Sequence, residues 1–282
     1  MLLRLITQQR NGEVIEQTLV KKVVESFVSL GLDSTDPNKE CLDIYKEHIE
    51  APFIVATEQY YKKESDTFLS QNTISDYLRK AEDRLKDEED RVERYLHAKT
   101  REDLISKCEH VLIREHAELI WDNFQTLLDF DKDEDLQRMY ALLSRIPEGL
   151  EPLRKRFEGH VKQAGLNAIS KLVGESGANT ESLDPKAYVD ALLEVYKKNS
   201  ETVARSFKGE AGFAASLDKA CRGFVNRNAA TTSSSKSPEL IAKYSDLILR
   251  TSNRMAEEED IESDLNRLVW FIATLTCNPG TQ

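Results

Sequence analysis

Residues 73–97 read TISDYLRKAEDRLKDEEDRVERYLH, and their spacing decides the fold class that we expect for the whole chain. The apolar residues follow one another at steps of four, three, four, seven and three, and Leu96 lies beside the last. These steps keep one face of an α-helix apolar, while charged residues occupy its other faces. The longest step passes Glu88, which is a polar interruption of the apolar face. The members of this stripe are Ile74, Leu78, Ala81, Leu85, Val92 and Tyr95.

The start of this helix carries a capping signal. Thr73 is a favoured N-cap residue, and Asp76, three residues on, can complete a capping-box-like pair with it. At a rise of 1.5 Å per residue the helix is about 37 Å long. It cannot bury its stripe alone, so we expect neighbouring long helices to cover it. The alternative is an exposed face for a coiled-coil partner, and Glu88 within the stripe argues against this.

The composition limits the function classes. The chain has 282 residues, of which 40% are hydrophobic and 32% charged, with only 11 glycines and 7 prolines, and this favours helices over turn-rich β structure. A net charge of -11 disfavours nucleic acid as the main partner. No apolar run approaches the roughly 18 residues that span a bilayer, so we expect no membrane association. The four cysteines suit a reducing cytosol or nucleus, and they are Cys41, Cys108, Cys221 and Cys277.

The same periodicity predicts helices along the rest of the chain. A helix at 16–30 is expected to bury Leu19, Val23, Phe27 and Leu30, with Gly31 at its C′ position. The next helix opens at Asp36-Pro37 and should be kinked by Pro52. Thr100 should cap a helix or a helix pair at 100–128. Further helices are expected at 2–9, ending near Asn11-Gly12, and at 136–146, 150–172, 188–207, 213–224, 238–248 and 261–275.

Two stretches lack this periodicity. Residues 173–185 contain two glycines and are expected to connect helical units, and residues 229–237 are rich in Ser and Thr and are expected to form an exposed loop. No segment alternates with the period of two that is typical of a strand. The predicted fold class is therefore all-α, an elongated stack of helical bundles.

The search for catalytic or metal-binding residues finds no convincing set. Cys108, His110 and His116 are the only cluster worth testing as metal ligands, but their spacings of two and six place them on different helix faces. Carboxylates occur in runs typical of solvated surface, such as residues 257–260. The common phosphate-binding, serine-nucleophile and zinc-protease motifs are not found. We therefore predict no catalytic, cofactor-binding or metal-binding residue, no cofactor and no enzymatic activity.

Two short motifs have weaker functional interpretations. Arg154-Lys155-Arg156 is more readily a solvated helix face than a site for an anion or an acidic partner. The loop at 233–238 (SSSKSP) is a weak candidate for phosphorylation, because it is expected to be exposed and a serine precedes proline.

Four motifs in register along the chain resemble the cullin family. They are DEDLQRMYALLSRI at 133–146, SKSPELIAKY at 235–244, the residues APF, ATE, YY and ES within 51–65, and AGF followed by LDKAC within 211–221. Several motifs in one order are far more specific than any one of them. Together they are most similar to the first cullin paralogue, the scaffold of SCF-type ubiquitin ligases.

The resemblance implies a stalk of cullin repeats, each a bundle of helices. Residues 1–34 would end a first repeat, 35–175 would form a second, 180–276 a third that is incomplete or divergent after 268, and 277–282 a tail. From about Val269 the sequence leaves the family pattern. We therefore expect a chain truncated at both ends, as a fragment, a splice form or a faulty gene model.

The resemblance also implies partners. In the family, the stalk spaces a Skp-type adaptor with its F-box receptor from a RING-box subunit, and it serves ubiquitin-dependent protein catabolism in cytoplasm and nucleus. The main docking regions of both partners are expected outside this chain, so no partner-binding residue is assigned. Stalk-binding regulators such as the cullin-associated exchange factor remain possible partners. The alternative is an unrelated helical rod or solenoid adaptor, such as a vesicle tether.

Overall fold

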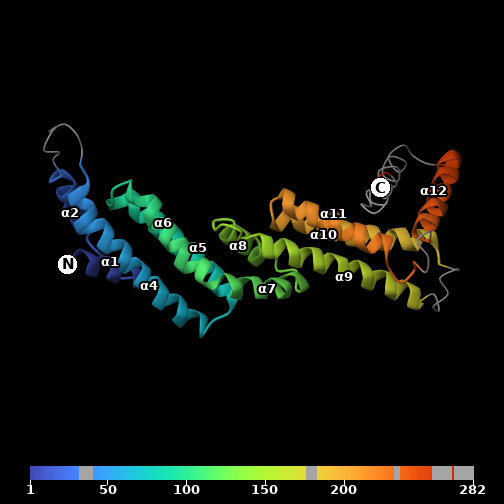
Figure 1. The fold of residues 1–282 in the computed structure, drawn as a ribbon, viewed down its shortest axis with the longest axis horizontal. Helices are drawn as coiled ribbons and strands as arrows, with labels where there is room; N and C mark the ends of the chain where they lie inside the picture. Colours follow the sequence, from blue (N-terminus) through green and yellow to red (C-terminus); the bar gives the residue numbers. More distant parts are fainter. Residues whose placement is uncertain (32–40, 176–182, 232–235, 256–268, 270–282) are drawn as a thin grey trace. The chain divides into compact units, whose positions relative to one another are not determined.

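The computed structural model describes residues 1–31, 41–175, 183–231, 236–255 and Val269, and every regular element among them is a helix (Figure 1). The all-α fold class is thereby confirmed for the described residues. The elements are α1 (Leu2–Arg10), α2 (Gln17–Ser29), α3 (Asp43–Tyr45), the π-helix η1 (Lys46–Glu50), α4 (Ala51–Leu69), α5 (Ile74–Tyr95), α6 (Thr100–Leu112), the 3₁₀ turn η2 (Arg114–His116), α7 (Ala117–Asp129), α8 (Asp133–Leu143), α9 (Glu151–Glu175), α10 (Pro185–Ser206), α11 (Ala211–Asn226) and α12 (Lys236–Met255).

The chain forms two compact units. The first contains Met1–Asn123 and Arg138–Gly149, and the second contains Phe124–Gln137 and Leu150–Gln282. These units are defined by contacts in space, whereas the predicted cullin repeats are defined by sequence, so the units do not test the repeats. The repeat boundaries at 34 and 175 therefore stay predictions.

The helix expected at 73–97 is α5, in the first unit. Its stripe is buried from Leu78 to Tyr95, and Ile74 is half-buried. Thr73 is the N-cap, because its hydroxyl accepts a hydrogen bond from the Asp76 backbone N–H at 3.2 Å. The same hydroxyl donates to the Asp76 carboxylate at 2.7 Å. The pair thus confirms the cap, although the carboxylate binds the threonine side chain rather than its backbone.

The predicted inward face of α2 was only partly correct, because Val23 and Phe27 are half-buried but the two ends of the predicted row are exposed. Val20 and Val24 are buried, whereas Leu19 is 37% and Leu30 60% exposed. Both rows have helical spacing, and the helix is covered along only a narrow line where it packs on α5 and α3. Gly31 follows the helix as expected, and a Cβ there would lie 1.7 Å from the Cys41 carbonyl oxygen.

Pro52 lies in the first turn of α4, where a missing N–H is tolerated. The preceding turn, η1, is a π-helix, and this wider turn lies where the proline cannot donate a helical hydrogen bond. A kink at Pro52 stays a prediction. Asp36-Pro37, the expected start of this helix, lies outside the described residues.

The stretch 100–128 forms two helices, α6 and α7, separated by η2. Thr100 does not cap α6, contrary to expectation, since it is the first helical residue and its side chain makes no capping bond. Its buried hydroxyl instead contacts the Glu50 carboxylate at 2.6 Å and the Tyr45 hydroxyl at 2.7 Å. These two bonds join the start of α6 to η1 and α3, while the helix itself packs against α4 and α5.

The second unit is built around α9, which packs against α10 and α11 (Figure 1). Three phenylalanines from different helices or turns meet in its core. The rings of Phe207 and Phe213 are stacked with centroids 4.0 Å apart, and Phe157 meets each of them at 5.7 Å. α12 packs against α10.

The predicted irregular stretches agree only in part with the structure. α9 continues to Glu175, and residues 176–182 of the expected connection lie outside the described residues. In the expected exposed loop, Ala230 and Ser237 are buried, which corrects that prediction for these two residues. The helix expected at 261–275 also lies outside the described residues, except Val269.

Candidate functional site

The structure does not bring the three tested metal-ligand candidates together as a site. Cys108 is buried, and burial raises the pKa of its thiol. The His110 ring lies 3.7 Å from the Glu115 carboxylate, and His116 meets the edge of Tyr77 instead. Within the described ranges, no three His, Cys, Asp or Glu side chains are arranged to hold a metal ion.

The basic run at 154–156 is partly used within the second unit. The Arg154 guanidinium donates to both carboxylate oxygens of Glu210, at 2.7 and 3.3 Å, and Lys155 lies 3.6 Å from Glu151. Glu210 also caps α11 by accepting from the Phe213 N–H at 3.0 Å. Burial alone would raise the pKa of Glu210, but the bonds from Arg154 and the backbone outweigh it and lower the pKa. Arg154 therefore holds α9 to the start of α11 rather than facing solvent freely.

The phosphorylation candidate is also corrected where the structure describes it. The Ser237 hydroxyl is buried and lies 3.0 Å from the Tyr188 hydroxyl, within α12 rather than in an exposed loop. A kinase could not reach this serine without opening the α10–α12 contact. Residues 233–235 lie outside the described residues.

An open groove of ≈ 570 Å³ lies between α9, α10 and the end of α7. His160 stands at its edge, where Nδ1 lies 2.8 Å from the Gln125 amide nitrogen and 3.5 Å from Asp129. Burial lowers the pKa of His160, an effect that the Asp129 charge only partly opposes. The apolar members of the lining are Leu128, Ala164, Ala168, Leu172, Ala191 and Val195. The polar and charged members are Asp129, His160, Lys171, Glu194, Lys198 and Asn199. Because no arrangement of these side chains points to a reaction, we assign no chemistry to this groove.

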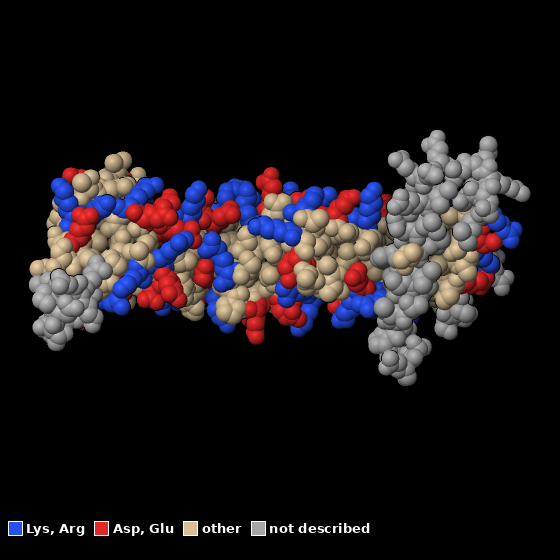
Figure 2. Space-filling view, turned by 90° about the horizontal axis from the view of Figure 1, so that it is seen from above, with Lys and Arg blue, Asp and Glu red and all other residues tan. Residues whose placement is uncertain are grey.

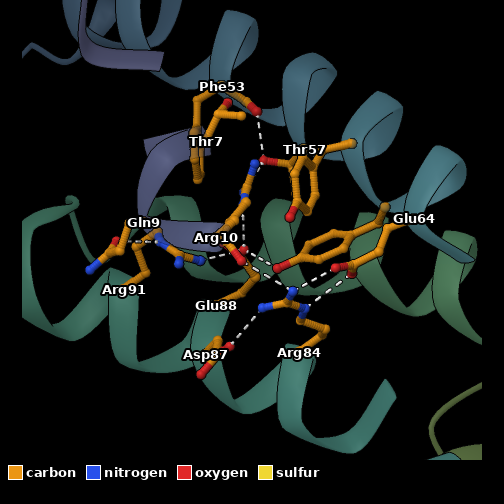
Figure 3. Close-up of polar contacts among 12 residues, drawn as sticks. Thr7, Gln9, Arg10, Phe53, Thr57, Glu64, Arg84, Asp87, Glu88 and Arg91 are labelled. Atoms are coloured by element: carbon orange, nitrogen blue, oxygen red, sulfur yellow. Dashed lines mark hydrogen bonds and ion pairs between the residues drawn. The ribbon is translucent and has the colours of Figure 1, made fainter. Parts of the chain in front are cut away.

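The most unusual polar cluster of the described residues lies in the first unit, where α1, α4 and α5 meet (Figure 3). One carboxylate oxygen of Glu88 accepts from Arg10 Nε at 2.9 Å, from Arg91 and from the Tyr61 hydroxyl. A second donor of Arg10, Nη2, binds the Thr57 hydroxyl at 2.7 Å. A carboxylate in the apolar stripe of α5 is thus compensated by two arginines and a tyrosine.

The charges of this cluster are fixed by their surroundings. Burial alone would raise the pKa of Glu88, but Arg10 first and Arg91 next outweigh it and lower the pKa. Burial, reinforced by the Glu88 charge, raises the pKa of the Tyr61 hydroxyl well above its ordinary value. Glu88 is therefore ionised and Tyr61 neutral at pH 7. Because Glu88 is 0% exposed, its carboxylate cannot meet a substrate while the three helices are packed.

The sequence pointed to only one member of this cluster. Glu88 stood out because it interrupts an apolar stripe, and an isolated buried carboxylate requires partners. Its main partner, Arg10, is 78 residues away and lies on a short helix. An arginine at the buried face of that helix was the remaining signal, since Ile6 and Arg10 are spaced by four.

The surface carries charges of both signs. Along the described part of the face in Figure 2, Lys and Arg alternate with Asp and Glu, and neither gathers into a continuous patch. Many form pairs one helical turn apart, such as Arg250 and Asp246 at 2.9 Å. Exposed pairs of this kind typically contribute less than about 1 kcal/mol to stability.

Among the described helices, none has the length and apolar character required to cross a membrane.

Comparison with known proteins finds a matching family and several similar proteins. A family described as the cullin alpha solenoid domain matches residues 1–277. Cullin-1 of Dictyostelium discoideum is 49% identical over 268 residues, which are 94% of this chain and 34% of that protein. Cullin-1 of Schizosaccharomyces pombe is 43% identical over 269 residues, or 95% and 35% of the two chains. Cullin-1 of Caenorhabditis elegans is 39% identical over 274 residues, or 93% and 34%.

The chain thus spans about a third of the length of these curated relatives. The match runs along almost all of the present sequence, through both compact units. It confirms the resemblance carried by the four motifs. This chain belongs to the cullin family.

Proposed function

We propose that this chain is a stalk segment of the scaffold of an SCF-type cullin–RING ubiquitin ligase. In that role it spaces a substrate-receptor module from the end that carries the RING-box subunit and the conjugating enzyme. The observation that carries the proposal is the match to Cullin-1 relatives along 93–95% of this chain. An unrelated helical rod, such as a vesicle tether, would share amphipathic helices but not this match.

The proposed contribution to ubiquitin transfer is positional and non-catalytic. Holding two reactants in a suitable geometry replaces an encounter in solution by an intramolecular one. That task requires helices that keep their positions rather than reactive side chains. Continuous packing, such as that of α6 on α4 and α5 or of α9 on α10 and α11, supports this role.

The partners proposed for the whole scaffold follow from the family. They are a Skp-type adaptor with its F-box receptor, a RING-box subunit and, along the stalk, the cullin-associated exchange factor. The process is ubiquitin-dependent protein catabolism in cytoplasm and nucleus. We further propose that residues 1–34, 35–175 and 180–276 belong to three successive cullin repeats.

A chimera tests the spacing role. The matching segment of Dictyostelium discoideum Cullin-1 is replaced by this chain, to which it is 49% identical. The chimera is assembled with its adaptor, receptor, RING-box subunit and charged conjugating enzyme, and ubiquitin transfer to a receptor-bound substrate is measured. We expect transfer within about threefold of the parent, because equivalent helices give an equivalent spacing.

The matched control replaces the same segment by a flexible Gly/Ser linker with the same number of residues. Its transfer rate should fall well below that of the chimera, because effective concentration decreases with the length of a flexible connection. A helical chimera that binds both modules but transfers no faster than the linker control would contradict the proposal.

A further inference from the structure

Helix α1 has only a modest apolar contact with the rest of the first unit. It has nine residues, and of these only Ile6 and Arg10 are buried, while Leu2, Leu3 and Leu5 are half-buried. Isolated helices shorter than about 12 residues are marginal in water, so α1 requires docking to remain helical. One buried isoleucine and three half-buried leucines are a modest apolar anchor for a whole helix. The polar contacts of α1 must therefore account for much of its docking.

These polar contacts gather at the last residues of α1. The Gln9 side-chain oxygen accepts from the Tyr95 hydroxyl at 2.7 Å and from Arg91 Nε at 3.2 Å. The Arg10 carbonyl accepts from Arg84 Nη2 at 3.1 Å, and this bond satisfies a carbonyl that the helix itself leaves free. The helix end is thus held by donors from α5.

The side chain of Arg10 enters a socket formed by α4 and α5 (Figure 3). Its guanidinium carbon lies 5.3 Å from the ring centres of Phe53 and Tyr60 and 5.1 Å from that of Tyr61. Glu88 and Thr57 accept from two different nitrogens, at 2.9 and 2.7 Å. Arg10 is only 4% exposed, so its charge depends on these groups for compensation.

The socket has the geometry of a guanidinium site. A guanidinium is planar and presents N–H donors in several directions of one plane, so it can reach a carboxylate and a hydroxyl at once while aromatic rings surround it. A lysine ammonium is a point charge that binds water more strongly. Nε, which donates to Glu88, also has no counterpart at the same distance along a lysine side chain.

We propose that Phe53, Thr57, Tyr60, Tyr61 and Glu88 form a guanidinium-specific binding site, and that Arg10 docks α1 by occupying it as an intramolecular ligand. The inference concerns the first unit alone and is independent of the proposed ligase role. It makes α1 a separately detachable element whose docking depends chiefly on the Arg10 side chain, with further bonds at Gln9 and at the Arg10 carbonyl.

Amide hydrogen exchange of the full chain tests the docking. In Arg10→Ala, amides of α1 should exchange about 100-fold faster, because removing one partner of a buried, hydrogen-bonded charge pair is strongly destabilising. Arg10→Lys should lose most of the same protection. The matched control is Arg4→Ala, since Arg4 is an exposed arginine of the same helix, and its effect should stay within about threefold. Amides of α6 serve as the reference within the unit.

Chemical rescue tests the site itself. Methylguanidinium should slow amide exchange in α4 and α5 of Arg10→Ala, because it refills the socket, whereas methylammonium at equal ionic strength should not. The original chain should respond to neither cation, since its socket is filled.

Four results would overturn the proposal. They are unchanged α1 protection in Arg10→Ala, full protection in Arg10→Lys, equal or absent responses to the two cations, and loss of α6 protection together with that of α1. Unchanged protection in Arg10→Ala would mean that apolar packing docks α1. Full protection in Arg10→Lys would mean that a positive charge alone is sufficient. The third would deny a guanidinium site, and the last would make α1 an inseparable part of the unit's core.

Discussion

Leu85 lies on the buried face of α5, where it is 2% exposed, whereas Glu82 lies one turn earlier on the charged side. We predict that Leu85→Asp lowers the free energy of unfolding by more than about 3 kcal/mol, because it buries a charge without a partner. Glu82→Ala should change it by less than about 0.5 kcal/mol, since Glu82 is exposed and its contact with the half-buried Arg138 is 3.5 Å long. Urea unfolding of both variants measures the difference. Equal shifts would show that the inward face of α5 is misassigned.

Glu88 should make the stability of the first unit dependent on pH. At pH 7, Glu88→Gln should cost about 3–5 kcal/mol, because it leaves Arg10 and Arg91 buried without their counter-charge. The folded pKa of Glu88 is lowered below the ordinary 4.5. The contribution of the carboxylate is therefore fully present above that ordinary value and is lost as the pH falls through the folded pKa.

The measurement is urea unfolding of both chains over a series of pH values. The difference between the original chain and Glu88→Gln should be largest near neutrality and should shrink as the pH falls below 4.5. Glu93→Gln is the matched control, because Glu93 is an exposed glutamate of the same helix. A difference that stays constant with pH would mean that the shape of the side chain, and not its charge, matters at this position.

At the scale of the helix, two glycines of α9 offer an internally matched test. A Cβ added to Gly165 would lie 2.4 Å from the Phe224 ring of α11, whereas one added to Gly159 would have nothing within 4 Å. Alanine favours a helix over glycine by about 1 kcal/mol, so Gly159→Ala should stabilise the chain by up to that amount. Gly165→Ala should instead destabilise it by about 1–3 kcal/mol, because overpacking outweighs helix propensity. Thermal unfolding distinguishes the two, and stabilisation by Gly165→Ala would contradict the close α9–α11 packing.

Helix spacing allowed most elements to be predicted from the sequence, but it left their inward faces less certain. The face of α5 was correct because its long apolar stripe is surrounded by charges. In α2, Leu19 and Val20 each begin a row with helical spacing, and only the neighbouring helices decide between them. Thr100 has a favoured capping side chain, yet its hydroxyl binds Glu50, which is 50 residues away. The capping propensity of a single residue cannot predict a hydrogen-bond partner that is distant in the sequence.

Composition was an equally incomplete guide to exposure. The Ser- and Thr-rich stretch at 229–237 predicted a solvated loop, but Tyr188 of α10 provides a buried hydroxyl partner for Ser237. The Asn228 amide donates to the same tyrosine at 2.9 Å. Polar residues with hydrogen-bond partners of this kind can be buried in a core. The partners are distant in the sequence, so only the folded structure identifies them.

At the scale of the whole molecule, the order of four motifs identified the family, and comparison confirmed it across residues 1–277. The candidate site was harder to predict, and no site residue was assigned from the sequence. The socket around Arg10 draws on α1, α4 and α5, and its members are spread from residue 10 to residue 88. No short motif contains such a set, so only the polar interruption at Glu88 pointed to it.

The last prediction concerns ubiquitin transfer by this chain alone. A ligase scaffold accelerates transfer by binding two modules at once, and this gain vanishes if either docking site is missing. The chain spans about a third of its Cullin-1 relatives, and we propose that the main docking sites lie in the remainder. We therefore expect no stimulation of ubiquitin transfer when the chain is mixed with a RING-box subunit and a charged conjugating enzyme.

The assay is ubiquitin discharge with and without the purified chain, with a full-length Cullin-1 as the positive control. In a second experiment, an excess of this chain is added to the full-length Cullin-1. It should compete only for partners that bind along the stalk. Clear stimulation together with stable RING-box binding would show that this segment itself recruits the catalytic subunit, and the proposed division of labour along the scaffold would then be wrong.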